Sequence, residues 1–373
     1  MTFARPPRGG AHCLWVLALT LIEGSASSGV LAGDPDPPVL TDATTIEQSG
    51  MHVSALGFSP DGTRLALAAG HESLQVFDVA TRKRVLRVGD VKQNFDDSIR
   101  EFAVAPEGKT LALGETCRTE ERNIAYAGRV RLADAATGKL LKKADFEWPT
   151  QALAHTPDGK LLAVGFMSGE VHLLDPATLA SRRLFRDPKQ APQTRRRDIA
   201  HIAFNPEGSC LALAFYSMRG PHEPPPDPDT EIHIWDVAAG KLVHRLLNPK
   251  AGGANSVAFA PRGAILAAGY SEGKVCLWDT STGKLTATYG DGAARVGAVA
   301  FSPDSRLLVE GGYKPALRVW EAGTGKLLFK HDTSEALPEV VSLAFSRDGK
   351  RLAAGSSHRT VVLWKVAPGG KTD

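Results

Sequence analysis

Val257–Lys284, which reads VAFAPRGAILAAGYSEGKVCLWDTSTGK, is the stretch of sequence that decides the fold. It contains three short apolar runs, and turn residues such as Gly, Pro, Ser and Asp separate each run from the next. Pro sets φ at a tight turn, whereas Gly supplies a backbone conformation that other residues avoid. The stretch therefore predicts three short strands of an antiparallel sheet.

Versions of this stretch recur along the whole sequence. Each copy has an apolar first strand whose last residue is followed by a turn such as SPDG, APEG or APRG. The first strands end at Phe58, Val104, His155, Phe204, Phe259, Phe301 and Phe345. These seven positions are 42 to 55 residues apart, and a repeat of this length is typical of a propeller or a comparable array.

The residue before the end of each first strand is always small. The seven residues are Gly57, Ala103, Ala154, Ala203, Ala258, Ala300 and Ala344. Small side chains are needed where neighbouring sheets converge on an axis, while the Phe and Trp of each repeat fill the wider gaps outside. We therefore predict an all-β, seven-bladed propeller of four-stranded antiparallel blades, with the first strands innermost.

The repeats resemble WD40 repeats in the pairing of (S/A)PxG turns with LWD and TGK steps, over about residues 51–366. A six-bladed TolB-like propeller shares the SPDG turns but not this pairing. Ala133 and Leu174 replace the aromatic residue of the third strand, and Lys365 replaces the acidic residue that follows it. The resemblance implies that an N-terminal strand, for which Val39–Ile46 is available, completes the last blade.

The N-terminus has the order of a secretory signal peptide. Arg5 and Arg8 precede a ten-residue apolar run, Cys13–Ile22, and small residues follow. Such a run is too short for a bilayer, which needs about 20 residues. A buried N-terminal helix or simple disorder is the alternative. We expect a signal peptide at 1–32, a linker and closing strand at 33–50, the propeller at 51–366 and a disordered tail at 367–373.

Composition and motifs exclude several classes of function. A net charge of +3 over 373 residues is too small to indicate a nucleic-acid partner. Cys117, Cys210 and Cys276 form no CxxC pair, so we expect no disulfide framework.

The chain has neither GxSxG nor HExxH, and we predict a protein without catalytic residues, cofactor or metal. We expect a monomer in the periplasm or outside the cell, with no membrane span after cleavage.

The long insertions fall in one class of connection. Turns after the first and third strands are short in every copy. Insertions follow the second strand at Glu115–Gly128 and Tyr216–Thr230, and the fourth strand at Gly89–Ser98 and Arg186–Asp198. Binding residues tend to lie on variable loops of a rigid scaffold, although neutral insertion is the alternative.

An arginine cluster lies in one of these insertions. Arg195, Arg196 and Arg197 stand just before the first strand of the fourth copy. Their guanidinium groups suit an acidic protein segment or a phosphate-bearing ligand. A solvated loop is the alternative, and Glu115, with other glutamates nearby, offers partial internal neutralisation.

Aromatic residues at the ends of second strands form a second candidate set: Phe166, Tyr216, Tyr270 and, nearby, Tyr313. Aromatic residues and Arg dominate the energetics of protein interfaces, and packing between blades is the alternative. The leading hypothesis is an exported protein-interaction scaffold with its partner face on the long loops. The alternative is a propeller enzyme or a small-ligand-binding propeller that uses the central channel, which shared architecture permits.

Overall fold

A computed structural model describes most of the repeat region. The chain divides into two units, Met1–Pro35 and Asp36–Asp373, and every described residue lies in the second. The predicted signal peptide, Arg195–Arg197 and the residues after Ala367 lie outside the described residues. The described residues are 39–47, 53–69, 74–89, 97–118, 126–187, 198–216, 231–248, 250–292, 294–314, 316–332, 334 and 337–367.

The described part of the chain consists of strands that form seven four-stranded sheets, and it contains no helix that could cross a membrane. Blades 1 to 3 contain β2 (Val53–Phe58), β3 (Arg64–Ala69), β4 (Leu74–Asp78), β5 (Arg84–Val88), β6 (Asp97–Val104), β7 (Thr110–Arg118), β8 (Tyr126–Asp134), β9 (Leu140–Phe146), β10 (Thr150–His155), β11 (Leu162–Phe166), β12 (Val171–Leu174) and β13 (Ser181–Phe185).

Blades 4 to 7 complete the ring, and the last of them takes the first strand of the chain. They contain β14 (Asp198–Phe204), β15 (Cys210–Tyr216), β16 (Ile232–Asp236), β17 (Lys241–Leu246), β18 (Ala254–Phe259), β19 (Ile265–Tyr270), β20 (Val275–Asp279), β21 (Lys284–Tyr289), β22 (Val296–Phe301), β23 (Leu307–Gly312), β24 (Leu317–Glu321), β25 (Leu327–His331), β26 (Val340–Phe345), β27 (Arg351–Ser356), β28 (Thr360–Ala367) and β1 (Val39–Glu47).

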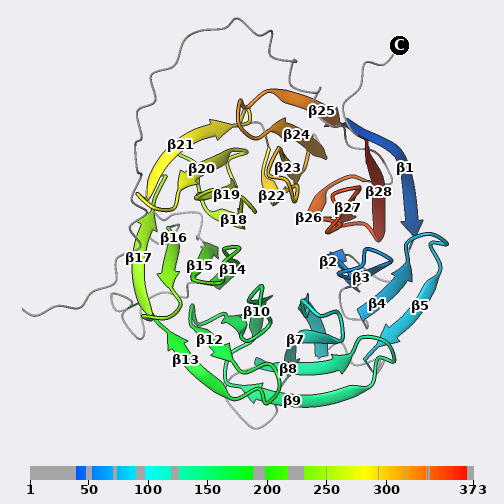
Figure 1. Cartoon of the computed structure of the whole chain (residues 1–373), viewed down its shortest axis with the longest axis vertical. Coiled ribbons are helices and arrows are strands. Elements are labelled where there is room, and N and C mark those ends of the chain that lie inside the picture. Colours follow the sequence, from blue (N-terminus) through cyan, green and yellow to red (C-terminus); the bar gives the residue numbers. More distant parts are fainter. Residues whose placement is uncertain are drawn as a thin grey trace, which may run out of the picture. The chain divides into compact units, whose positions relative to one another are not determined.

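The first strand of each blade lies nearest the axis, as the small residues predicted. In blades 1 to 6 the strands pair in sequence order, and in blade 7 β26, β27 and β28 do so with β1 added outside β28. The first strands surround the middle of the ring (Figure 1). A Cβ added to Gly57 would lie 3.6 Å from the ring of Phe102 in the next blade, which is an ordinary van der Waals contact and agrees with Ala at the six equivalent positions. The seven four-stranded sheets confirm the predicted seven-bladed architecture.

The recurring acidic residue at the end of the third strand stabilises the turn that follows. In blade 5, Oδ1 of Asp279 accepts hydrogen bonds from the Thr282 N–H at 2.8 Å and the Ser281 hydroxyl at 2.6 Å. Gly283 then adopts φ of +69°, which favours glycine. In blade 7, Lys365 occupies this position, and β28 continues beyond it to Ala367.

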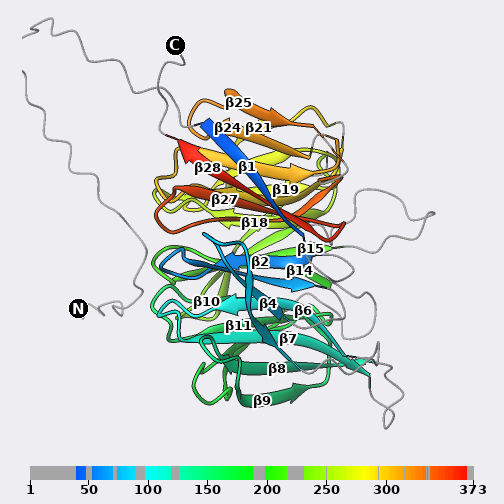
Figure 2. The ribbon, with the colours of Figure 1, turned by 90° about the vertical axis from the view of Figure 1, so that its right-hand side faces the viewer.

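The closing strand β1 completes blade 7, as predicted. It pairs antiparallel with β28 from Val39–Ala367 to Glu47–Thr360, and the two strands lie side by side in Figures 1 and 2. Ile46 is 2% exposed, so β1 contributes to the core as well as to the ladder. The Lys365 Nζ lies 2.8 Å from an Asp42 carboxylate oxygen.

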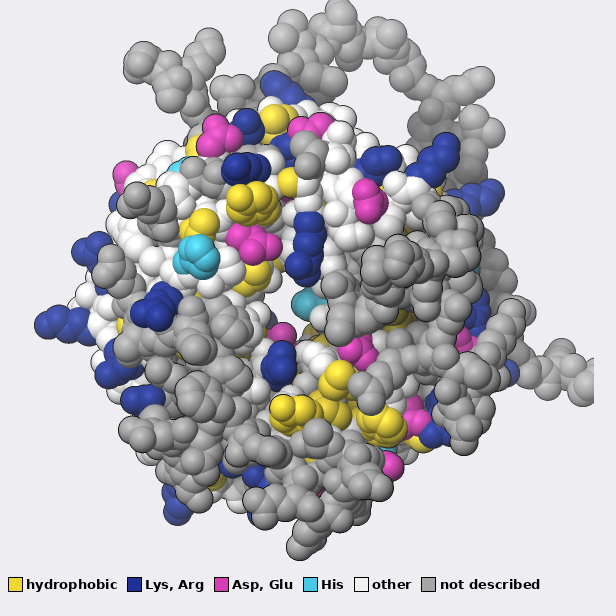
Figure 3. Space-filling model, turned by 180° about the vertical axis from the view of Figure 1, so that it is seen from behind, with side chains coloured by type: hydrophobic (Ala, Val, Ile, Leu, Met, Phe, Trp, Pro, Cys, Tyr) yellow, Lys and Arg dark blue, Asp and Glu magenta, His cyan; other side chains and the backbone are white. Residues whose placement is uncertain are grey.

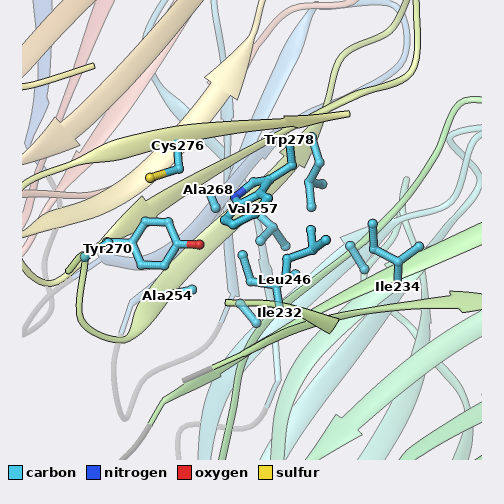
Figure 4. Close-up of a cluster of buried hydrophobic side chains, with 13 residues drawn as sticks. Ile232, Ile234, Leu246, Ala254, Val257, Ala268, Tyr270, Cys276 and Trp278 are labelled. Atoms are coloured by element: carbon cyan, nitrogen blue, oxygen red, sulfur yellow. The ribbon is translucent and has the colours of Figure 1, made fainter. Parts of the chain in front are cut away.

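Large side chains fill the gaps between blades. Trp278 of β20 packs in one buried cluster with Ile232, Ile234 and Leu246 of the preceding blade (Figure 4). In the same way, the other third-strand Trp side chains share clusters with residues of the blade before their own. They are Trp235, Trp320 and Trp364.

One predicted insertion is shorter than expected. Part of Glu115–Gly128 belongs to the long hairpin of β7 and β8, with Cys117 opposite Ala127 and Thr116 opposite Gly128. The polar residues of Glu115–Gly128 led to the prediction of a loop over the whole segment. The ladder continues because Cys117 and Thr116 are buried, and their backbone groups need partners there.

Candidate functional site

The two ends of the propeller carry different kinds of connection. Turns after first and third strands, which lie on what we call the turn face, have four to six residues between strand bounds. Connections after second and fourth strands, on what we call the loop face, have three to fifteen residues. Figure 3 views the loop face, where charged and His side chains surround a central hollow.

The structure places the four aromatic candidates differently. Tyr313 follows β23 and is 48% exposed, with the Lys314 ammonium 5.4 Å from its ring centroid. Phe166 and Tyr270 are only 2% and 0% exposed, so neither can be a contact residue on the surface. Tyr216 is the last residue of β15, and its side chain is outside the described part.

Packing explains both buried candidates. The ring of Phe166 lies 5.0 Å from that of Phe146 and 5.2 Å from that of His172, measured between centroids. Tyr270 belongs to the cluster of Trp278 (Figure 4), and burial raises the pKa of its hydroxyl. The alternative of packing between strands and blades therefore applies to these two residues.

An arginine that the sequence analysis did not single out joins the ends of the two longest loop-face connections. Arg245 of β17 donates to both carboxylate oxygens of Asp187, at 2.6 and 2.9 Å, and to Glu231 at 3.0 Å. Asp187 is the second residue of the connection after β13, and Glu231 is the last residue of the connection after β15. The hydrogen bond to Asp187 raises the pKa of Arg245, which therefore stays charged.

Other blades repeat this arrangement at the loop face. In blade 6, Arg318 of β24 lies 2.6 Å from the Glu310 carboxylate and 2.7 Å from that of Asp291. In blade 2, the Arg131 guanidinium lies 3.0 Å from the Glu115 carboxylate. Each pair joins a strand to a neighbouring strand or connection, so ionic contacts anchor the strand ends beneath this face.

A sequence signal for these pairs exists at a shared position. The third position before the acidic end of the third strand is polar in five copies and Cys in a sixth, although its side chain is buried or partly buried. The residues are Gln75, Arg131, His172, His233, Cys276 and Arg318. A buried polar side chain is expected to have a hydrogen-bond or ion-pair partner, but the sequence alone does not identify that partner.

The central channel contains a cavity of about 300 Å³ that the first strands of blades 1 to 4 line. Glu101 of β6 and His201 of β14 both contribute to its wall. All first strands carry a β-bulge just before this position, and bulges re-aim side chains at the rims of closed sheets. The equivalent residues of the other blades are small: Ala55, Ala152, Ser256, Ala298 and Ser342.

The pKa values of the two titratable groups are both shifted toward the neutral form. Burial raises the pKa of Glu101 to about 8, even though its carboxylate accepts the Phe102 N–H at 3.0 Å. Burial lowers the pKa of His201 to about 4. The channel wall therefore offers a carboxylic acid and a neutral imidazole rather than an ion pair.

We expect Glu101→Gln to stabilise the protein at pH 8 by ~1–2 kcal/mol and to have no effect near pH 4. The folded state keeps the Glu101 proton up to about pH 8, whereas the unfolded chain loses it above its ordinary pKa of 4.5. Stability of the wild type therefore falls as pH rises through this window, and the amide removes that loss. Urea unfolding at pH 4, 6 and 8 measures the difference. The exposed Glu147→Gln is the control, and an equal effect at all pH values would contradict the expectation.

Among the described residues, no group of three or more His, Cys, Asp or Glu side chains could hold a metal ion. No disulfide bond joins any two of the three described cysteines, Cys117, Cys210 and Cys276. The candidate sites are therefore the loop face and the channel wall, and neither carries a metal-ligand arrangement in the described part.

A comparison with protein families finds two matching segments. The family model described as WD domain, G-beta repeat matches residues 240–279 and 326–365. Each segment begins with the fourth strand of one blade and ends in the third strand of the next. The sequence repeat is thus one strand out of phase with the blade, which is why β1 is needed to complete blade 7.

Proposed function

The chain belongs to the WD40-repeat propellers, and from that premise we propose that it is a scaffold that binds a partner protein through its loop face. Propellers of this family generally mediate protein interactions. The loop face differs from the turn face because it carries all the long connections. Connections of different length on a rigid scaffold are a common place for specific binding residues.

The Arg245 contacts are the observation that carries this proposal. A connection of twelve residues follows β13 and one of fifteen follows β15, and Arg245 links Asp187 and Glu231 at their ends. Fixing the ends of a binding loop lowers the entropy that the loop loses when a partner binds. The Arg195–Arg197 cluster lies within the first of these connections, which favours an acidic segment on the partner.

Exposed apolar side chains add a second argument. Tyr126, Leu247 and Tyr313 are 50%, 37% and 48% exposed, and each lies at a strand end or connection of the loop face. The other large exposed hydrophobic residues of the described part lie on the outermost strands. Arginine and aromatic residues together are the usual source of binding energy at protein interfaces.

We further propose that the protein acts after export, in the periplasm or outside the cell. The proposal depends on the order of charged, apolar and small residues in the first 32 positions. Mass spectrometry of the secreted protein, which gives its mass and its N-terminal residue, tests the proposal of export. An N-terminus at Met1 in the mature protein would contradict export by signal cleavage.

Affinity capture from an envelope or secreted fraction tests the loop-face proposal. Replacing Arg195, Arg196 and Arg197 together by Ser is expected to weaken partner capture by about tenfold or more, and Tyr313→Ser by several fold. Lys160→Ser, which removes a cation whose side chain is 81% exposed on the turn face, is the control and should capture as the wild type does. Partners that bind all these variants equally would contradict this choice of face.

Ligand binding in the central channel is the second candidate function. The observation that favours it is the cavity of about 300 Å³ with Glu101 and His201 in its wall. A neutral acid and a neutral imidazole suit a small uncharged polar molecule, because neither group repels it or needs a counterion. A screen of such molecules by thermal shift, with Glu101→Ala and His201→Ala in parallel, tests this candidate.

A further inference from the structure

At two positions where most other blades have aromatic side chains, the junction between blades 1 and 2 has small ones, and Phe102 of β6 is the aromatic residue in its buried cluster. At the end of the third strand, four blades have Trp and blade 1 has Phe77, whereas blade 2 has Ala133. At the end of the first strand, five blades have Phe, whereas blade 2 has Val104. Both changes remove volume on the side of blade 2 that faces blade 1, because Ala133 and Val104 share a buried cluster with Ala66 and Val76.

A cavity of about 320 Å³ lies at this junction. Its apolar wall contains Ala66 and Val76 of blade 1, together with Val104, Leu111 and Ala135 of blade 2. Leu111 is the register partner of Ala133. The cavity opens at the turn face, where its polar rim consists of Ser59, Asp61, Thr63, Arg64 and Glu107.

The equivalent space between blades 4 and 5 contains an indole. Trp278 there shares a cluster with Ala212, Ile234 and Phe259, which occupy the positions of Ala66, Val76 and Val104. Figure 4 shows Trp278 and Ile234 of this cluster. The same fold therefore encloses a Trp ring at one junction and leaves room at the other. The cavity between blades 1 and 2 is thus lined by the equivalents of residues that cluster with an indole between blades 4 and 5.

The rim adds a chemical preference. The Ser59 hydroxyl and the Thr63 N–H donate to Oδ1 of Asp61 at 2.5 and 3.0 Å, and these hydrogen bonds lower the pKa of Asp61. Asp61 and Glu107 supply two carboxylates, and the only guanidinium in the rim is that of Arg64, which donates to the Ala135 carbonyl at 3.4 Å. The rim therefore favours N–H donors and disfavours an anionic group beside the ring.

We propose that this junction binds the side chain of a Trp residue in an extended segment of a partner protein. The ring replaces the indole that the repeats supply elsewhere, and the rim carboxylates accept N–H groups of the ring or of the segment backbone. The site lies at the turn face, opposite the proposed loop-face interface. It therefore does not depend on the proposed function, and either can fail without the other.

The test is a titration of the full-length protein with the capped tripeptide Ac-Gly-Trp-Gly-NH2 carrying 5-fluorotryptophan, followed by 19F NMR. Wild type is expected to bind at one site. Ala133→Trp places an indole at the position that Trp278 has in blade 5, next to the lining residues Ala66, Val76 and Val104, and is expected to weaken binding by about tenfold or more. Val104→Phe narrows the cavity from the other wall and should weaken binding in the same direction, so a folding defect in one variant does not decide the result.

Trp278→Ala is the matched variant, because it should open the equivalent space between blades 4 and 5 and create a second site. Free indole and indole-3-acetate distinguish the source of the ring, and both should bind more weakly than the tripeptide. The proposal is overturned if wild type shows no saturable binding, or if Ala133→Trp and Val104→Phe both bind as the wild type does. Indole binding as tight as that of the tripeptide would overturn the assignment to a partner segment.

Discussion

A chain without Val39–Glu47 is expected to lose cooperative unfolding and to aggregate. Removing β1 leaves β28 as the open edge of blade 7, and an exposed strand edge pairs readily with other chains. It also removes Leu40 and Ile46 from the buried surface of that blade, where they are 5% and 2% exposed. Size-exclusion chromatography and urea unfolding followed by circular dichroism measure the two effects.

A point variant separates the loss of the core contact from the loss of the strand. Ile46→Asp places a carboxylate where the side chain is buried and should destabilise the protein by about 3 kcal/mol or more. The exposed neighbour Thr45→Asp adds the same charge on the other face of β1 and should change stability by less than ~0.5 kcal/mol. A soluble deletion variant that melts as the wild type does would contradict the role of β1 in closure.

The fold was predictable because its determinants are local and repeated. Asp279 and the turn after it form hydrogen bonds within a few residues, so the motif in the sequence is also the contact in the structure. The small residues at Gly57 and its equivalents likewise indicate that the first strands of neighbouring blades lie close together around the axis. Closure by β1 followed from the count of strands together with the family resemblance.

The candidate site was less predictable because it depends on contacts between blades. Phe166 and Tyr270 stand at strand ends, where the sequence suggests exposure, but side chains from elsewhere in the fold bury them. Arg245 meets Asp187 across 58 positions of sequence, and no local motif indicates that pair. Ala133 was visible as a departure from the repeat, but the cavity beside it requires the neighbouring blade.

Arg318→Met is expected to destabilise the protein by ~3–5 kcal/mol at pH 7, because it leaves the Glu310 carboxylate buried without its cation. The two side chains are 8% and 5% exposed, and their nearest N–O distance is 2.6 Å. Glu310 and Arg318 are also directly paired in the β23–β24 ladder, so neither can move away without disturbing the blade.

The pH dependence of this variant distinguishes electrostatics from lost packing. Burial already raises the pKa of Glu310 while Arg318 lowers it, so removing Arg318 raises that pKa further. The folded variant then holds a proton that the unfolded chain releases, and its deficit should grow as pH rises above about 4.5 and shrink below it.

The double variant Glu310→Met with Arg318→Met tests whether the unpaired carboxylate causes the loss of stability. It removes both charges, and replacing a buried ion pair by apolar side chains of similar size is often neutral or stabilising. We expect its free energy of unfolding to lie within ~1 kcal/mol of the wild type and to lack the added pH dependence. If the double variant is as unstable as Arg318→Met alone, the packing of the arginine stem, rather than the unpaired carboxylate, causes the loss.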